Sequence, residues 1–284
     1  MNKLKSIFCA IMLFMVCAIM CVGCSFGKDN LPSDSDSKEI TISLTEAESV
    51  IYDALQIQAG QINRDVFKKW GKFELTSVLR GIYLNTNNLA GSKKTSLFAT
   101  YENGVYDNVY STYELHDVEH DQHTIRESYT VDNIEYTYEN STVSNDNVDK
   151  VELPSEADVV KKLFTDDFLY LVYGNKVTKK VTTDGYTLVF RNGLQGLANF
   201  QCIMIGHDVK ESYIEELEAM YSDAELSESY IQLSVEFDKQ NNITEIKISY
   251  LALEPSQYGK SEAVITAKKS TANIPVPEWY LNRL

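Results

Sequence analysis

The sequence predicts an α+β protein whose main element is a strongly curved, unclosed antiparallel β-sheet, a half-barrel, with a few amphipathic helices on its concave face. Most of the chain consists of short segments in which apolar and polar residues alternate around turn residues, which is typical of antiparallel hairpins. Only a few segments have helical spacing, and they do not alternate regularly with strands. A parallel, doubly wound sheet is therefore not expected.

The clearest strands form a hairpin near the C-terminus. Ile231, Leu233, Val235 and Phe237 alternate with polar residues up to a turn at 240–242. Such alternation places one apolar face against a core and one polar face in water. The same pattern recurs in residues 134–138, 176–181, 186–191 and 246–250.

Three helices are expected to accompany these strands. Thr45 and Glu48 have capping-box spacing at the start of a segment that ends near Gly60. Its apolar residues recur at helical spacing, at Ala47, Val50, Ile51, Ala54 and Leu55. Two further amphipathic segments are predicted to begin at Ser155 and Ser212.

An export signal is predicted at the start of the chain. Two lysines precede the apolar run Ile7–Val22, which is shorter than the roughly 20 residues that span a bilayer. Gly23 and Cys24 end this run and resemble the bacterial lipobox. That resemblance implies that Cys24 is diacylated and anchors the protein to the outer face of the bacterial cytoplasmic membrane. Cys21 departs from the leucine usual in that motif, so an ordinary signal peptide and an uncleaved anchor remain alternatives.

The chain is expected to divide into three segments. Residues 1–23 form the signal peptide, and residues 24–40 hold the lipidated cysteine and a flexible polar tether. Residues 41–284 form a single domain. The polar stretch at 140–150 is an alternative boundary between two domains, but neither half supplies enough helices to cover its own sheet.

Charge and cysteine content limit the partners. The chain has a formal charge of −15, and the mature protein is more negative still, because Lys3 and Lys5 are lost with the signal. Because no basic cluster offsets this charge, nucleic acid is not an expected partner. Only Cys24 and Cys202 remain after export, and the apolar run 200–205 predicts a strand in which Cys202 is buried. No internal disulfide is expected, and we expect a monomer.

Beyond the signal, the mature chain resembles the clostridial-type surface lipoproteins whose fold is similar to the lipoprotein carriers LolA and LppX. The matching features are the capped helix after the tether, the hairpin at 231–250 and the closing Asn-Ile-Pro-Val-Pro run at 273–277. They extend loosely over the predicted domain. The resemblance implies a sheet that wraps helices around an apolar cavity. It transfers no functional residue, since generic apolar side chains line such a cavity.

Candidate ligand-binding residues come from the apolar faces of two predicted strand pairs. They are Tyr136, Tyr138, Leu233, Val235 and Phe237. The wider set of strand tyrosines has three interpretations: ordinary sheet packing, the wall of a lipid cavity, or an aromatic platform for a glycan.

A histidine-rich segment is the candidate metal site. His116, His120 and His123 lie among four carboxylates, a composition that suits zinc. If this segment is a helix, the three histidines share one face. If the chain turns between two strands at 119–121, the three imidazoles meet only across the hairpin, and the flanking strands favour this turn. We therefore favour a solvated turn over a metal site, and no cofactor is expected.

No catalytic motif is predicted, because the chain contains no Gly-x-Ser-x-Gly elbow and no phosphate-binding glycine loop. The paired acids at 166–167 and 215–216 lie on predicted helices, where a charged outer face is normal. The sequence thus predicts a non-enzymatic cell-surface lipoprotein that binds or carries an apolar, lipid-like ligand. The alternative is an envelope or glycan interaction module that uses exposed aromatic residues of the sheet.

Overall fold

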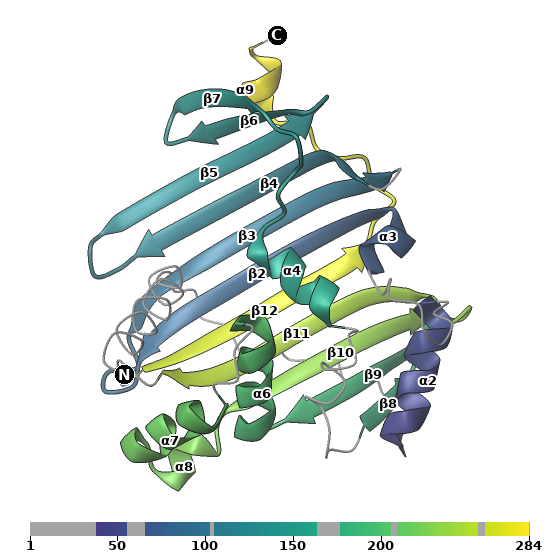
Figure 1. Cartoon of the computed structure of the whole chain (residues 1–284), viewed down its shortest axis with the longest axis vertical. Coiled ribbons are helices and arrows are strands. Elements are labelled where there is room, and N and C mark those ends of the chain that lie inside the picture. The colour runs from purple at the N-terminus through teal and green to yellow at the C-terminus, as the bar shows by residue number, and fades with distance from the viewer. Residues whose placement is uncertain are drawn as a thin grey trace.

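The predicted fold class is confirmed by the computed structural model, which describes residues 38–55, 66–102, 105–163, 177–205, 210–254 and 259–283. Its main element is one antiparallel sheet of twelve strands (Figure 1). The sheet does not close, since β1 (Lys38–Ile42) and β7 (Thr142–Asn147) lie at its two edges. The predicted signal peptide and Cys24 lie outside the described residues.

All neighbouring strands of the sheet pair antiparallel. Because the last strand in sequence pairs with β2, strands from both sides of the polar stretch at 140–150 belong to one sheet. Between the edges, the order is β8 (Val177–Val181), β9 (Gly185–Asn192), β10 (Tyr230–Asp238), β11 (Ile243–Glu254), β12 (Gly259–Lys269), β2 (Lys72–Tyr83), β3 (Leu89–Glu102), β4 (Val105–Asp117), β5 (Gln122–Val131) and β6 (Ile134–Glu139).

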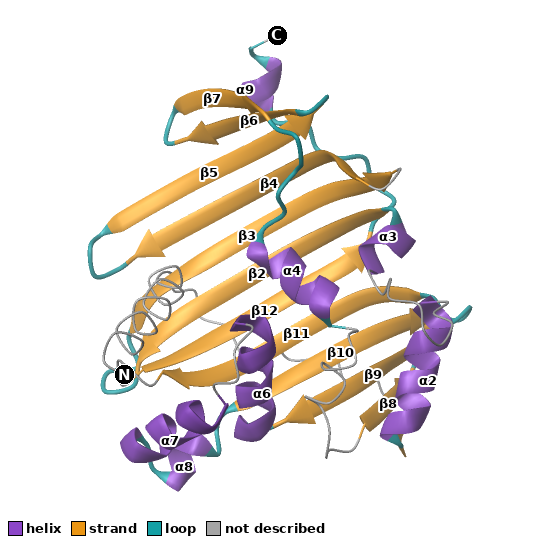
Figure 2. Ribbon diagram, in the orientation of Figure 1, coloured by secondary structure: helices purple, strands orange, loops and turns teal. Residues whose placement is uncertain are grey.

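Within the described parts of the chain, four helices lie across one face of this sheet, which we call the helix-covered face: α2 (Leu44–Leu55), α3 (Val66–Trp70), α4 (Ser155–Lys162) and α6 (Leu194–Ile205) (Figure 2). Two more, α7 (Lys210–Met220) and α8 (Asp223–Leu226), pack beside α6 and contact the end of β11. The last helix, α9 (Glu278–Leu281), packs instead on the opposite face. Within the described ranges, no helix has the length and apolar character needed to cross a bilayer.

The hydrophobic core lies between the helix-covered face and its helices. Alternate residues of β10, from Ile231 to Phe237, are buried there, as the unbroken alternation predicts. Helix α2 adds the apolar stripe that contains Ile51, and α3 adds Phe67, whose ring stacks on Phe73 of β2 with centroids 3.9 Å apart. The apolar sides of the helices and of the strands therefore pack against each other in one layer.

The predicted hairpin between β10 and β11 is confirmed. Asp238 Oδ1 accepts hydrogen bonds from the backbone N–H groups of Gln240 at 2.8 Å and Asn242 at 2.9 Å. Asn241 adopts a left-handed backbone with φ of 61°, which asparagine tolerates better than most residues. The Asp-Asn turn at 132–133 is also present, with both φ angles positive.

The first helix begins at a different cap from the one predicted. Ser43 Oγ accepts a hydrogen bond of 3.1 Å from the backbone N–H of Glu46, and the helix starts at Leu44. Thr45, the predicted cap, lies within the first turn. Ser43 and Glu46 have the same capping-box spacing as Thr45 and Glu48, so two overlapping signals compete in the sequence.

The other predicted helices also start differently. Pro154, rather than Ser155, occupies the N-cap of α4, and no side chain caps that end. Helix α7 includes Lys210, two residues before the predicted start at Ser212.

Two segments have a different secondary structure from the one predicted. Residues 200–205, expected to form a strand around Cys202, form the end of α6, because a short apolar run fits a buried strand and a buried helix equally well. The polar stretch at 140–150 contains β7, whose residues are all exposed at the sheet edge, so no alternation marks it.

Candidate functional site

A serine interrupts the apolar row that β2 contributes to the core. Phe73, Leu75, Ser77 and Leu79 all point to the helix-covered face and are buried. The neighbour of Ser77 on β3 is Thr95, and these two residues are only 2% and 3% exposed. Among the described residues, neither Ser77 Oγ nor Thr95 Oγ1 has a hydrogen-bond partner. Because an unpaired buried polar group costs about 1–3 kcal/mol, two adjacent ones mark a candidate site rather than an ordinary core.

A buried ion pair lies beside these hydroxyls. Lys93 precedes Thr95 by two residues and therefore points to the same face of β3. Its Nζ lies 2.6 Å from Oε1 of Glu156, in the first turn of α4, and the two side chains are 14% and 4% exposed. The same Nζ lies 5.5 Å from the ring centroid of Tyr113 on β4. The ion pair thus fastens α4 to the middle of the sheet.

The polar residues continue along one row of the sheet. Tyr113 is the neighbour of Thr95, and Arg126 on β5 is the neighbour of Tyr113 at the exposed end of the row. Burial raises the pKa of the Tyr113 hydroxyl, and the nearby Glu156 raises it further, whereas Arg126 opposes the shift. We call Ser77, Lys93, Thr95, Tyr113 and Glu156 the polar strip.

A second polar group borders the strip on the side of α6. Burial, with a smaller contribution from Glu254 and then Glu156, raises the pKa of the Tyr250 hydroxyl on β11. Burial also raises the pKa of Glu254, although Ser261 donates a hydrogen bond of 2.6 Å to its Oε1. The helix-covered face is therefore apolar over β9 and β10 but mixed over β11, β12, β2 and β3.

The polar strip was not predicted from the sequence. The available signal was Ser77, a polar residue at an inward position of an alternating strand. In a sequence without a known register, that residue is indistinguishable from an ordinary strand serine. The contribution of Glu156 requires α4 to cross the sheet, which no local pattern predicts.

Three of the predicted ligand-binding residues lie in the packed core. Leu233, Val235 and Phe237 are fully buried on the helix-covered face of β10. The Phe237 ring stacks on that of Tyr186 on β9, with centroids 4.8 Å apart. Protein side chains therefore occupy the surroundings of these three residues.

The other two predicted residues lie on the opposite face. The register connects Leu97 with Ser111, Ser128 and Thr137, which places Thr137 on the helix-covered side. Tyr136 and Tyr138 flank Thr137 on β6 and so point away from the helices. The sheet thus separates the two halves of the predicted site, and one ligand cannot contact both halves at once.

On that opposite face, Tyr136 and Tyr138 contact the last helix of the chain. The Tyr138 ring stacks on Trp279 with centroids 5.8 Å apart, and Tyr136 lies 4.8 Å from Tyr280 in a T-shaped arrangement. Tyr280 also lies 4.8 Å from the ring of Tyr129. We call these five residues the aromatic cluster.

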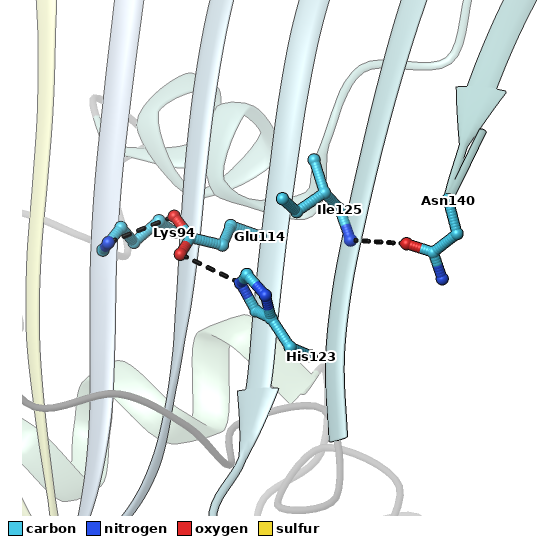
Figure 3. Close-up of polar contacts among 5 residues, drawn as sticks. All are labelled: Lys94, Glu114, His123, Ile125 and Asn140. Carbon is cyan, nitrogen blue, oxygen red and sulfur yellow. Dashed lines mark hydrogen bonds and ion pairs between the residues drawn. The ribbon is translucent and has the colours of Figure 1, made fainter. Parts of the chain in front are cut away.

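The predicted histidine segment forms the turn between β4 and β5. His116 and His123 are direct neighbours across the strands, with ring centroids 5.8 Å apart, whereas His120 contacts Asp117 at 2.7 Å. His123 Nε2 lies 3.2 Å from Glu114, which also pairs with Lys94 at 3.1 Å (Figure 3). Over the stretches of the chain that the structure describes, no group of three His, Cys, Asp or Glu residues is placed to hold a metal ion.

Comparison with known proteins yields structural matches only. No family model and no curated protein matches the chain. LprF from Mycobacterium bovis matches over 84% of this chain and 99% of its own, with 11% identity and a TM-score of 0.35. A DnaN sliding clamp from Bartonella birtlesii matches over 84% of this chain and 66% of its own, with 10% identity and a TM-score of 0.15.

Proposed function

We propose that the protein is an exported, membrane-tethered lipoprotein that binds an apolar, lipid-like ligand between the helices and the helix-covered face of the sheet. The observation that best supports this proposal is that the helix-covered face carries both apolar and polar side chains. An apolar layer on β9 and β10 is separated only by the mixed strands β11 and β12 from the polar strip, where the hydroxyls of Ser77 and Thr95 are unpaired among the described residues. Such a surface suits a molecule with an apolar body and a polar end. No catalytic step is included in the proposal.

Entry of a ligand requires some of the helix layer to move, because the apolar residues beneath it are fully buried. Helix α4 is the segment we assign to this movement. It spans eight residues, its N-terminus has no side-chain cap, and the Lys93–Glu156 pair joins it to the sheet. Isolated helices of this length are unstable in water, so α4 depends on its contacts with the sheet.

A photo-crosslinking experiment tests the location of the ligand. The full chain, purified from its host, is irradiated with a diazirine-bearing fatty acid, and modified peptides are identified by mass spectrometry. Cross-links are expected in β2, β3 and α4 and should decrease when unlabelled fatty acid is added. Labelling no greater than that of the heat-unfolded protein would contradict the proposal.

Membrane tethering rests on Gly23 and Cys24 at the end of the apolar run and on the polar residues that follow. The variant Cys24→Ala should lose metabolic labelling by fatty acid and either enter the medium or remain unprocessed. A matched variant, Cys21→Ala, should retain labelling. Unchanged fatty-acid incorporation in Cys24→Ala would exclude the lipobox interpretation.

The second candidate function, an envelope or glycan interaction module, is favoured by the aromatic cluster on the opposite face. Several rings gather there outside the main helix layer. If this second function is correct, the fatty acid in the crosslinking experiment should label neither α4 nor its neighbouring strands. Purified cell-wall material should instead retain the protein, and Trp279→Ala should reduce that retention.

A further inference from the structure

We infer that Ser77 and Thr95 bind an uncharged, hydroxyl-bearing head group of the ligand. This inference rests on the proposed function, since it specifies the polar end of the molecule that the helix-covered face would hold. It also assigns a role to two side chains that the core itself leaves without partners within the described residues. Helix α4 lies over this region of the sheet (Figure 1).

The geometry suits a ligand hydroxyl. Ser77 and Thr95 are direct neighbours on antiparallel strands, where facing Cα atoms are about 5 Å apart. Each hydroxyl can donate one hydrogen bond and accept others. A hydroxyl or a vicinal diol placed between them can therefore pair with both residues at once. An apolar group at the same place would leave both buried hydroxyls unpaired.

The charges around the strip favour an uncharged group over an anion. The only cation beside the two hydroxyls among the described strip residues, Lys93, is already neutralised by Glu156 at 2.6 Å. An anionic head group would have to displace this carboxylate or remain buried beside it, and both arrangements are costly. Arg126 is exposed at the outer end of the row, away from the buried hydroxyls. The strongly acidic chain adds no long-range attraction for anions.

Three probes with one acyl chain test the inference. Glycerol monooleate carries two free hydroxyls, methyl oleate carries none, and oleate carries a negative charge. The full chain, kept in solution by amphipol, is mixed with equal concentrations of the three, and native mass spectrometry reads their ratio in the complex. Glycerol monooleate should exceed each of the others by about tenfold, as expected for two additional hydrogen bonds.

Two double variants locate the effect. Ser77→Ala with Thr95→Val should abolish the preference for glycerol monooleate while binding of methyl oleate is retained, which also reports that the variant is folded. The control, Thr76→Val with Ser96→Ala, changes a facing pair on the opposite side of the same strands and should keep the preference.

The outcomes separate the two proposals. Equal binding of all three probes, a preference for oleate, or a preference that survives in the Ser77 and Thr95 variant would overturn the head-group assignment and leave apolar binding intact. Binding of none of the three would overturn the proposed function itself, and the head-group assignment with it.

Discussion

The indole nitrogen of Trp279 lies 2.8 Å from Oε2 of Glu127, which fastens the last helix of the chain to β5 on the face opposite the main helix layer. The same oxygen accepts a hydrogen bond of 2.9 Å from the Tyr110 hydroxyl. Burial and this bond raise the pKa of Tyr110 to about 12, so the phenol remains a donor at neutral pH. Because α9 has only four residues, its position depends on these contacts and on the aromatic cluster.

Replacing Trp279 by alanine should therefore release α9. Amide hydrogen exchange of residues 278–283 is expected to rise to that of an unstructured peptide, since both the indole hydrogen bond and the ring contact with Tyr138 are lost. Val276→Ala removes an exposed side chain just before the helix and should change nothing. Unchanged protection of the C-terminal peptide in the Trp279 variant would refute this account of α9.

Phe237 should behave as a core residue. Phe237→Ala is expected to lower the free energy of unfolding by about 3–5 kcal/mol, because it removes a fully buried ring that stacks on Tyr186. Glu236→Ala, on the exposed face of the same strand, should change it by no more than about 0.5 kcal/mol. Urea unfolding of both variants measures the difference. Similar small effects would mean that Phe237 faces a ligand space rather than packed side chains.

Two ion pairs of equal length provide a matched test of burial. Lys93→Ala leaves Glu156 as an unpaired buried charge and should destabilise the protein by about 3–5 kcal/mol. Lys180→Ala breaks the Lys180–Glu39 pair, which has the same 2.6 Å separation but side chains that are 45% and 56% exposed. Its effect should stay below about 1 kcal/mol. If chemical unfolding gave equal decreases in the free energy of unfolding for the two variants, burial would not determine the cost of breaking an ion pair.

The local patterns of the sequence predicted some of the core elements, although part of the core helix α6 was expected as a strand and α3 was not predicted. The segment in which Leu233 and Val235 alternate with polar residues forms β10. The segment with helical spacing around Ile51 forms α2. Both patterns report which side of an element is buried, and the fold buries those sides. The edge strand β7 was missed because both of its faces meet solvent, so its residues show no alternation.

The candidate site was less accessible to sequence analysis. A pattern shows that Tyr136 and Leu233 each belong to an apolar row, but it does not show which side of the common sheet each row occupies. That depends on the register through every intervening strand. The Lys93–Glu156 pair likewise joins residues that are far apart in sequence. Such sites need the assembled sheet to be recognised.

The histidine segment should not depend on a metal for its stability. His120 contacts Asp117, and His123 contacts Glu114, so both side chains already have partners within the hairpin. Treatment with EDTA is expected to leave the melting temperature unchanged, as is His116→Ala. A large decrease with EDTA that zinc reverses would establish the metal site that the turn interpretation rejects.

The stability of the fold should depend on pH through Glu236. Glu236 on β10 directly faces Glu245 on β11, and burial together with this like charge raises the Glu236 pKa above its usual value of 4.5. For an acid whose pKa is raised in the folded state, the associated stability is present below the unfolded-state pKa and is lost as pH increases through the folded-state pKa.

Glu236→Gln removes this loss, so at pH 7 the variant should be more stable than the unmodified protein. The gain should be less than about 1 kcal/mol, because solvent still reaches this partly desolvated side chain and screens the repulsion. The advantage should shrink at pH 4, where most of Glu236 is protonated in both states. Urea unfolding at the two pH values measures it, with Glu228→Gln as the exposed control. An advantage that is equal or larger at pH 4 would show that repulsion between the two glutamates is not its cause.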